Sequence, residues 1–137
     1  MQSDLILWPA LALAAQTFIV AMLMGASRFI GISRRQIDAR YFRLNQGYEI
    51  PALPAQIANN YHNLLQLPVL FYALIAFLLV TGRADATFIW LAWAFVASRV
   101  VHSIIHIAYN YVPHRFAAFL LGVGILLAMW IRFALAL

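Results

Sequence analysis

Two rows of polar side chains interrupt otherwise apolar stretches of the sequence. The first row consists of four amides at helical spacing: Gln56, Asn59, Asn63 and Gln66. A helix turns by 100° per residue, so these four lie within about 80° of one another on one face. Amides donate and accept hydrogen bonds, and such a row either binds a polar ligand or holds neighbouring helices together.

The second row is cationic. It runs along one helical face, with Ser103 and Tyr109 at its edges, and consists of Arg99, His102, His106 and Asn110. An arginine at the centre of a membrane span costs at least about 2.5 kcal/mol unless it finds a partner or water. The four acids all fall outside the apolar stretches: Asp4, Asp38, Glu49 and Asp85. We therefore expect an anionic ligand to neutralise Arg99, with a structural role as the alternative.

His102 and His106 form an HxxxH pair, which can bind a metal or contribute to a haem site. We expect no metal, because no carboxylate or cysteine stands nearby and Arg99 would repel a cation. The sequence contains no cysteine at all. Any thiol chemistry must therefore use a thiol that the ligand brings.

The composition predicts how these residues are carried. Hydrophobic residues make up 66% of the 137 and charged residues only 9%, which excludes a water-soluble domain. The length accommodates four membrane spans and no separate soluble domain. We predict an all-α, integral membrane four-helix bundle with up-down-up-down topology, formed by residues 1–137 as a single domain.

The four spans are predicted from the apolar runs at residues 5–26, 55–80, 87–111 and 116–137. The first run has no basic flank before it, so we interpret it as a retained helix and not as a signal peptide. Pro68 is expected to kink the second span. A basic connection separates the first two spans, and short turns join the others.

Basic residues predict the orientation in the membrane. The first connection contains five arginines, whereas the turn between the second and third spans offers only Arg83 beside Asp85. Positive residues mark the cytoplasmic side, so both termini are expected on the outer side. The net charge of +5 includes no basic block typical of nucleic-acid binding, and we expect no nucleic-acid partner.

At about 1.5 Å per residue, the amide row and the cationic row reach the same membrane depths. The two rows can therefore face each other and form a pocket that opens toward the cytoplasmic ends. Arg115 and Arg28 are expected at that opening. Both are candidate anion-binding residues, although boundary arginines also serve as simple topology markers.

Two runs, QIANNYHNLLQLPVLFYALIAFLL and RVVHSIIHIAYNYVPHR, resemble the MAPEG family, the membrane-associated proteins in eicosanoid and glutathione metabolism. The resemblance covers essentially the whole chain. It implies a homotrimer that binds glutathione between subunits on the cytoplasmic side, where an arginine stabilises the thiolate. By spacing Arg115 matches that arginine, and Arg28 is the second possibility. The implied glutathione-binding residues are Arg99, His102, His106, Asn59, Asn63, Gln66 and Tyr109.

The second span departs from the family motif E-R-x-x-R-A-x-x-N-x-x-E. Here the motif positions are occupied by Ala55, Gln56, Asn59, Asn60, Asn63 and Gln66. Only Asn63 is kept, and neutral residues replace both arginines and both glutamates.

The resemblance implies a glutathione-dependent transferase or peroxidase that acts on lipophilic electrophiles. The alternative is a non-enzymatic member of the fold, either an accessory subunit of a larger membrane complex or a binder of lipid or quinone. The expected location is a bacterial inner membrane, with the endoplasmic reticulum as the alternative.

Overall fold

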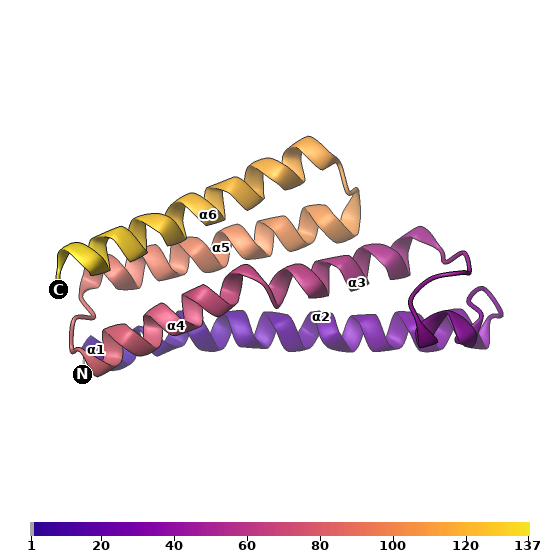
Figure 1. Cartoon of the computed structure of the whole chain (residues 1–137), viewed down its shortest axis with the longest axis horizontal. Coiled ribbons are helices and arrows are strands. Elements are labelled where there is room, and N and C mark those ends of the chain that lie inside the picture. Colours follow the sequence, from indigo (N-terminus) through magenta and orange to yellow (C-terminus); the bar gives the residue numbers. More distant parts are fainter. Residues whose placement is uncertain (1) are drawn as a thin grey trace.

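The structure is a computed structural model that describes residues 2–137. Its elements in chain order are α1 (Gln2–Leu5), α2 (Leu7–Ser33), η1 (Ala39–Arg43), α3 (Ala52–Leu64), α4 (Leu67–Val80), α5 (Ala86–Ala108) and α6 (Val112–Leu135). The long helices run up, down, up and down, and the two chain ends lie at the same end of the bundle (Figure 1). The predicted all-α fold is confirmed.

Four stretches are long and apolar enough to cross a bilayer: Leu7–Ser33, Ala52–Val80, Ala86–Ala108 and Val112–Leu135. The first helix ends at Ser33 and not near residue 26, so Arg28 lies in a helix and not in the loop. The last helix begins at Val112 because Pro113 fits a first helical turn. Arg115 therefore also belongs to a helix and not to the preceding connection.

The second span is broken between α3 and α4. Pro68 has no backbone N–H to donate to the carbonyl of Leu64, the last residue of α3. The chain turns at Gln66, whose φ and ψ are −95° and −88°, and α4 begins at Leu67. This break places Gln66 at the junction of a polar half-span and an apolar one.

Helix α5 lies at the centre of the bundle and packs against α2, α3 and α6. Figure 1 shows α5 between α6 on one side and the α3/α4 span on the other. Phe95 of α5 stacks on Phe71 of α4 with 4.8 Å between the ring centroids, and both rings are fully buried. Arg99, His102, Ser103 and His106 lie on the buried face of α5, so its polar face meets other helices and not lipid.

Two connections fix the bundle ends. At the end with the termini, Asp85 caps α5 by accepting a 2.9 Å hydrogen bond from the amide of Phe88. Its second carboxylate oxygen accepts a 2.6 Å bond from Arg132 of α6. At the other end, Asn110 adopts a left-handed conformation (φ 48°) between α5 and α6, which aims its side chain back toward α6.

Candidate functional site

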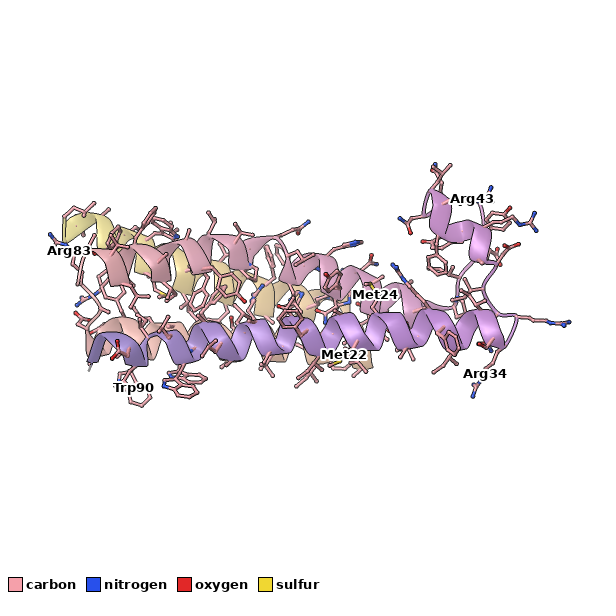
Figure 2. The ribbon with its side chains drawn as sticks, turned by 90° about the horizontal axis from the view of Figure 1, so that it is seen from below. Met22, Met24, Arg34, Arg43, Arg83 and Trp90 are labelled. Carbon is pink, nitrogen blue, oxygen red and sulfur yellow. The ribbon has the colours of Figure 1, made fainter. Side chains whose placement is uncertain are left out.

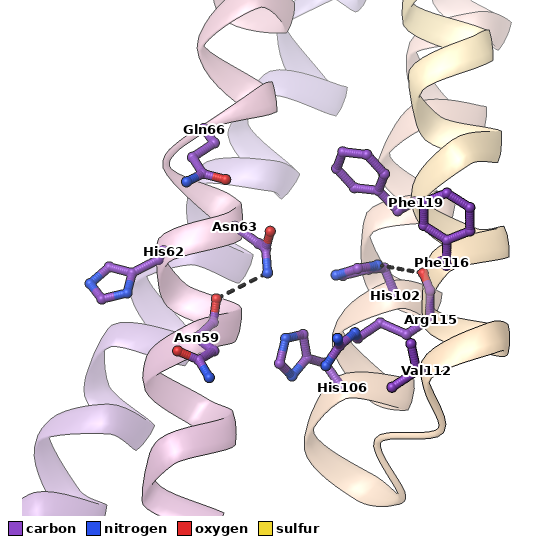
Figure 3. A pocket seen from close by; sticks show the side chains of 10 residues that line it. All are labelled: Asn59, His62, Asn63, Gln66, His102, His106, Val112, Arg115, Phe116 and Phe119. Carbon is purple, nitrogen blue, oxygen red and sulfur yellow. Dashed lines mark hydrogen bonds between the residues drawn. The ribbon is translucent and has the colours of Figure 1, made fainter.

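A polar cleft of about 470 Å³ lies between α3 on one side and α5 with α6 on the other. Helix α3 and the break after it contribute Asn59, His62, Asn63 and Gln66; α5 contributes His102 and His106; α6 contributes Val112, Arg115, Phe116 and Phe119. Figure 3 shows the amides on one side of the cleft and His102, His106 and Arg115 on the other, with Asn63 pointing across. The cleft lining contains no carboxylate.

The amide wall follows from the helical period of α3. Asn59 and Asn63 are one turn apart, and the side-chain N–H of Asn63 donates to the Asn59 carbonyl at 3.1 Å. Gln66 joins them from the break before α4. Three of the four predicted amides therefore line the cleft, whereas Gln56 does not.

The tautomer of His102 is set by the backbone of α6. Its Nδ1 lies 3.1 Å from the carbonyl oxygen of Arg115, and a carbonyl only accepts, so Nδ1 carries the proton. Nε2 of His102 is then left with a lone pair, and it has no partner among residues 2–137. The site thus holds a buried acceptor for a ligand N–H or O–H group.

His106 lies one helical turn from His102, with the two rings 5.7 Å apart in an edge-to-face arrangement. The Nδ1 atom of His106 also has no partner within the described residues. Both histidines are buried and line the cleft. Two adjacent unsatisfied ring nitrogens favour a polar ligand group at this level.

Arg115 supplies the positive charge of the cleft. Its Nη1 donates a 2.6 Å hydrogen bond to the side-chain oxygen of Asn110, which orients the guanidinium. In the described part of the chain Arg115 forms no ion pair, and its side chain is half-buried. Its charge is therefore available to an anion in the cleft.

Arg99 is not part of the cleft lining. Its Nη2 donates to the α6 carbonyls of Ala118 and Phe119 at 3.1 and 3.3 Å. Its Cζ is 5.5 Å from the ring centroids of both Phe95 and Phe119, and the residue is 1% exposed. Through these contacts Arg99 connects α5 to α6 behind the cleft wall. The sequence had instead predicted that Arg99 contacts the ligand.

Arg28 and Tyr109 also lie away from the main cleft. Arg28 lines a separate hollow of about 290 Å³, in which its guanidinium is 4.8 Å from the ring centroid of Phe42. The two hollows have Asn59 and His62 in common. Tyr109 is exposed at the end of α5, where its hydroxyl is 3.2 Å from Nδ1 of His114.

A buried chain of hydrogen bonds stands behind the amide wall. Gln16 of α2 donates to Ser103 of α5 at 2.8 Å, and Ser103 donates to the Oδ1 of Asn60 in α3 at 3.1 Å. Gln16 also donates to the carbonyl of Arg99 at 3.1 Å. The chain fixes three helices against one another and thereby sets the position of both cleft walls.

Four residues of this region are not among the site residues predicted from the sequence: Gln16, Asn60, Phe116 and Phe119. Gln16 is a lone amide within an apolar span, which is a signal for an interhelical bond. Asn60 follows Asn59 directly but lies on a different side of the helix, because one residue turns the helix by 100°. Phe116 and Phe119 carried no signal in the sequence, since aromatic residues are frequent in all four spans.

A separate apolar slot of about 430 Å³ lies along the seam between α4 and α6. It is lined by Leu67, Leu70, Val123, Leu126, Leu127 and Trp130. Leu67 directly follows Gln66 of the cleft, and Val123 is one helical turn beyond Phe119. The polar cleft and the apolar slot are thus lined by neighbouring turns of the same two spans.

The site does not resemble a metal centre. Within residues 2–137, no three His, Cys, Asp or Glu side chains come together in a way that could hold a metal ion. The three histidines of the cleft lining have amides and an arginine as the other polar side chains of that lining. This donor set suits an anionic or neutral organic ligand better than a cation.

A sequence model of the MAPEG family matches residues 6–135. No curated protein and no solved structure matches the chain.

Proposed function

The chain belongs to the MAPEG family, and on this premise we propose that its cleft binds glutathione and delivers the thiolate to a lipophilic electrophile. The observation that carries the proposal is the guanidinium of Arg115. It lies in a cleft without carboxylates and is oriented by a neutral amide, Asn110. A positive charge in that position stabilises a thiolate and lowers the pKa of the thiol.

The other cleft residues have matching roles in this proposal. Asn59, Asn63 and Gln66 hydrogen-bond the peptide portion of glutathione, because amides both donate and accept. The free Nε2 of His102 accepts from a ligand N–H group. Arg99 acts indirectly, through the position of Phe119.

In the proposed reaction, the thiolate donates an electron pair to an electrophilic carbon and a carbon–sulfur bond forms. The bond from that carbon to its leaving group breaks, and the leaving group departs with the bonding pair. With an epoxide, the carbon–oxygen bond opens and the oxygen takes a proton from water. The apolar slot between α4 and α6 accommodates the apolar part of the acceptor.

A second candidate is a MAPEG-fold binder of a quinone or single-chain lipid, without chemistry, either alone or as an accessory subunit of a larger complex. The observation that favours it is the nearly neutral cleft. Glutathione carries two carboxylates and an ammonium group, whereas Arg115 is the one charged side chain in the lining. A quinone carbonyl needs no charged partner and suits the donors of Asn63 and Gln66.

The test is calorimetric titration of the detergent-purified protein with glutathione and with S-methylglutathione, which has no ionisable thiol. Arg115→Leu should weaken glutathione binding by ten- to a hundredfold, as expected for a charge-assisted bond of about 1.5–3 kcal/mol. It should leave S-methylglutathione nearly unaffected. Arg83→Leu, at an exposed arginine of the opposite end, is the matched control.

Absence of heat with either peptide, together with saturable binding of a short-chain quinone, would instead establish the second candidate. Equal losses for both peptides in Arg115→Leu would contradict the thiolate role. Gel filtration and circular dichroism should verify that the wild type and both variants are folded.

We further propose that the protein works as a homotrimer in a bacterial inner membrane, with the η1 end in the cytoplasm. The family supports the trimer, and the arginines of the η1 end support the orientation. Native mass spectrometry of the detergent-purified protein should give the mass of three chains, and a monomer mass alone would contradict the trimer.

A further inference from the structure

Three arginines form an exposed basic surface at the η1 end of the bundle. We define this basic end surface as Arg34, Arg35 and Arg43. All three are exposed, and none forms an ion pair within residues 2–137. The acids in this segment are Asp38 and Glu49. Asp38 forms a salt bridge with Arg40, with 3.0 Å between Oδ2 and Nη2. The surface therefore carries uncompensated positive charge.

The length of α2 places this surface at the depth of lipid headgroups. Its 27 residues span about 40 Å, whereas the hydrocarbon core of a bilayer is about 30 Å thick. Figure 1 shows α2 running past the ends of α5 and α6. In Figure 2, Arg34 and Arg43 project away from the bundle on different sides of the connecting segment.

A hydrogen-bonded turn at the end of α2 holds the arginines in place. Arg35 adopts a left-handed conformation (φ 55°), and the amides of Gln36 and Ile37 donate to the carbonyl of Gly31 at 2.8 and 3.1 Å. Ile37 is buried directly against Gly31, where a Cβ would lie 2.8 Å from its Cγ1. The segment is thus folded back onto the end of α2 and not left free.

Large apolar side chains are exposed beside the arginines. Phe29 and Leu44 are each 73% exposed, and Ile30 is 47% exposed. Such a combination is typical of an element at the membrane interface, with apolar side chains in the acyl boundary and cations at the phosphates.

We propose that the basic end surface binds anionic phospholipid headgroups of the adjoining leaflet. The charge is complementary, the depth matches, and exposed apolar side chains stand beside the cations. The interaction anchors the η1 segment over the hollow that contains Arg28. It is independent of the ligand in the polar cleft.

The test is native mass spectrometry of the detergent-purified protein with equimolar phosphatidylglycerol and phosphatidylcholine. We expect saturable binding with a preference for phosphatidylglycerol that weakens with added salt. Each arginine near the surface contributes a factor of about five. The variant Arg34→Gln/Arg35→Asn/Arg43→Gln should lose most of the preference, and Asn keeps the left-handed position favourable.

The matched control is Arg83→Gln, which removes an exposed arginine at the opposite end and should leave the preference unchanged. Equal occupancy by the two lipids, or an unchanged preference in the triple variant, would overturn the proposal. A third arm adds inorganic phosphate alone. If millimolar phosphate displaced the lipid completely, the surface would be a free-anion site and the membrane proposal would also fail.

Discussion

Gly122 of α6 lies directly against the guanidinium of Arg99 in α5. A Cβ at this position would collide with Nη2 of Arg99 and would lie 2.8 Å from both its Cζ and the Oγ of Ser98. The absence of a side chain lets Arg99 reach the carbonyls of Ala118 and Phe119. The buried cation and the glycine therefore form one packing unit between α5 and α6.

Gly122→Ala should destabilise the protein by about 1–3 kcal/mol, as expected for overpacking a buried site. The guanidinium is enclosed, so it has no free direction in which to move. Gly124→Ala is the control on the same helix, because a Cβ there meets nothing within 4 Å. The control should be neutral or stabilising by up to about 1 kcal/mol. Thermal unfolding in detergent measures both, and equal behaviour of the two variants would contradict the close packing.

The hydrogen bonds of Ser103 are expected to matter more than those of its neighbour Ser98. Ser103→Ala would leave the buried Oδ1 of Asn60 without its donor and remove one acceptor of Gln16, at a cost of about 1–3 kcal/mol. The Oγ of Ser98 donates its hydrogen bond within its own helix, to the carbonyl of Phe95 at 2.6 Å. Ser98→Ala should therefore cost less than about 1 kcal/mol.

Denaturation of each serine variant in detergent, monitored by circular dichroism, compares the two costs. If Ser98→Ala lowered the free energy of unfolding as much as Ser103→Ala, the interhelical hydrogen bonds would contribute no additional stability. If Ser103→Ala also loosens the cleft, its ligand affinity should fall with its stability.

The faces of the polar helices could be predicted from the sequence, because the helical period alone determines which residues share a side. The predicted pocket contains Asn59, Asn63, His102 and His106, and these four line one cleft in the structure. The sequence also predicted the disruption of the second span at Pro68. These features depend on local geometry and on little else.

The role of Arg99 could not be predicted in the same way. Its long side chain reaches carbonyls of the next helix, and this contact exists only because Gly122 stands opposite. The tertiary packing of the helices decides which helix lies against a given glycine, and the helical repeat of the sequence does not. Likewise Arg115 was expected at a loop, but Pro113 starts α6 early enough to include it.

Acid should weaken the end of the bundle that contains Asp85. The pKa of Asp85 is lowered, first by the hydrogen bond from the Phe88 amide and then by Arg132. A carboxyl with a depressed pKa contributes stability above its unfolded-state pKa of about 4 and loses it as the pH falls through its lower folded-state value. Melting temperature should therefore fall below about pH 4 in the wild type.

Asp85→Asn should show a smaller fall over the same pH range, because the variant has already lost the ionised cap. Glu49→Gln is the control, since Glu49 is exposed and has no ion pair in the described residues. Asp38 is retained in all three proteins, so its own titration cancels. Parallel pH profiles for wild type and Asp85→Asn would contradict the stabilising cap.

The proposed orientation can be tested sharply because the chain has no cysteine. Arg43→Cys places a single thiol at the η1 end, and Arg83→Cys places one in the exposed turn at the opposite end. With the η1 end in the cytoplasm, a membrane-impermeant maleimide should label Arg83→Cys in intact cells. It should label Arg43→Cys only after lysis. The reverse pattern would invert the orientation and put the opening of the polar cleft on the outer side, away from cytoplasmic glutathione.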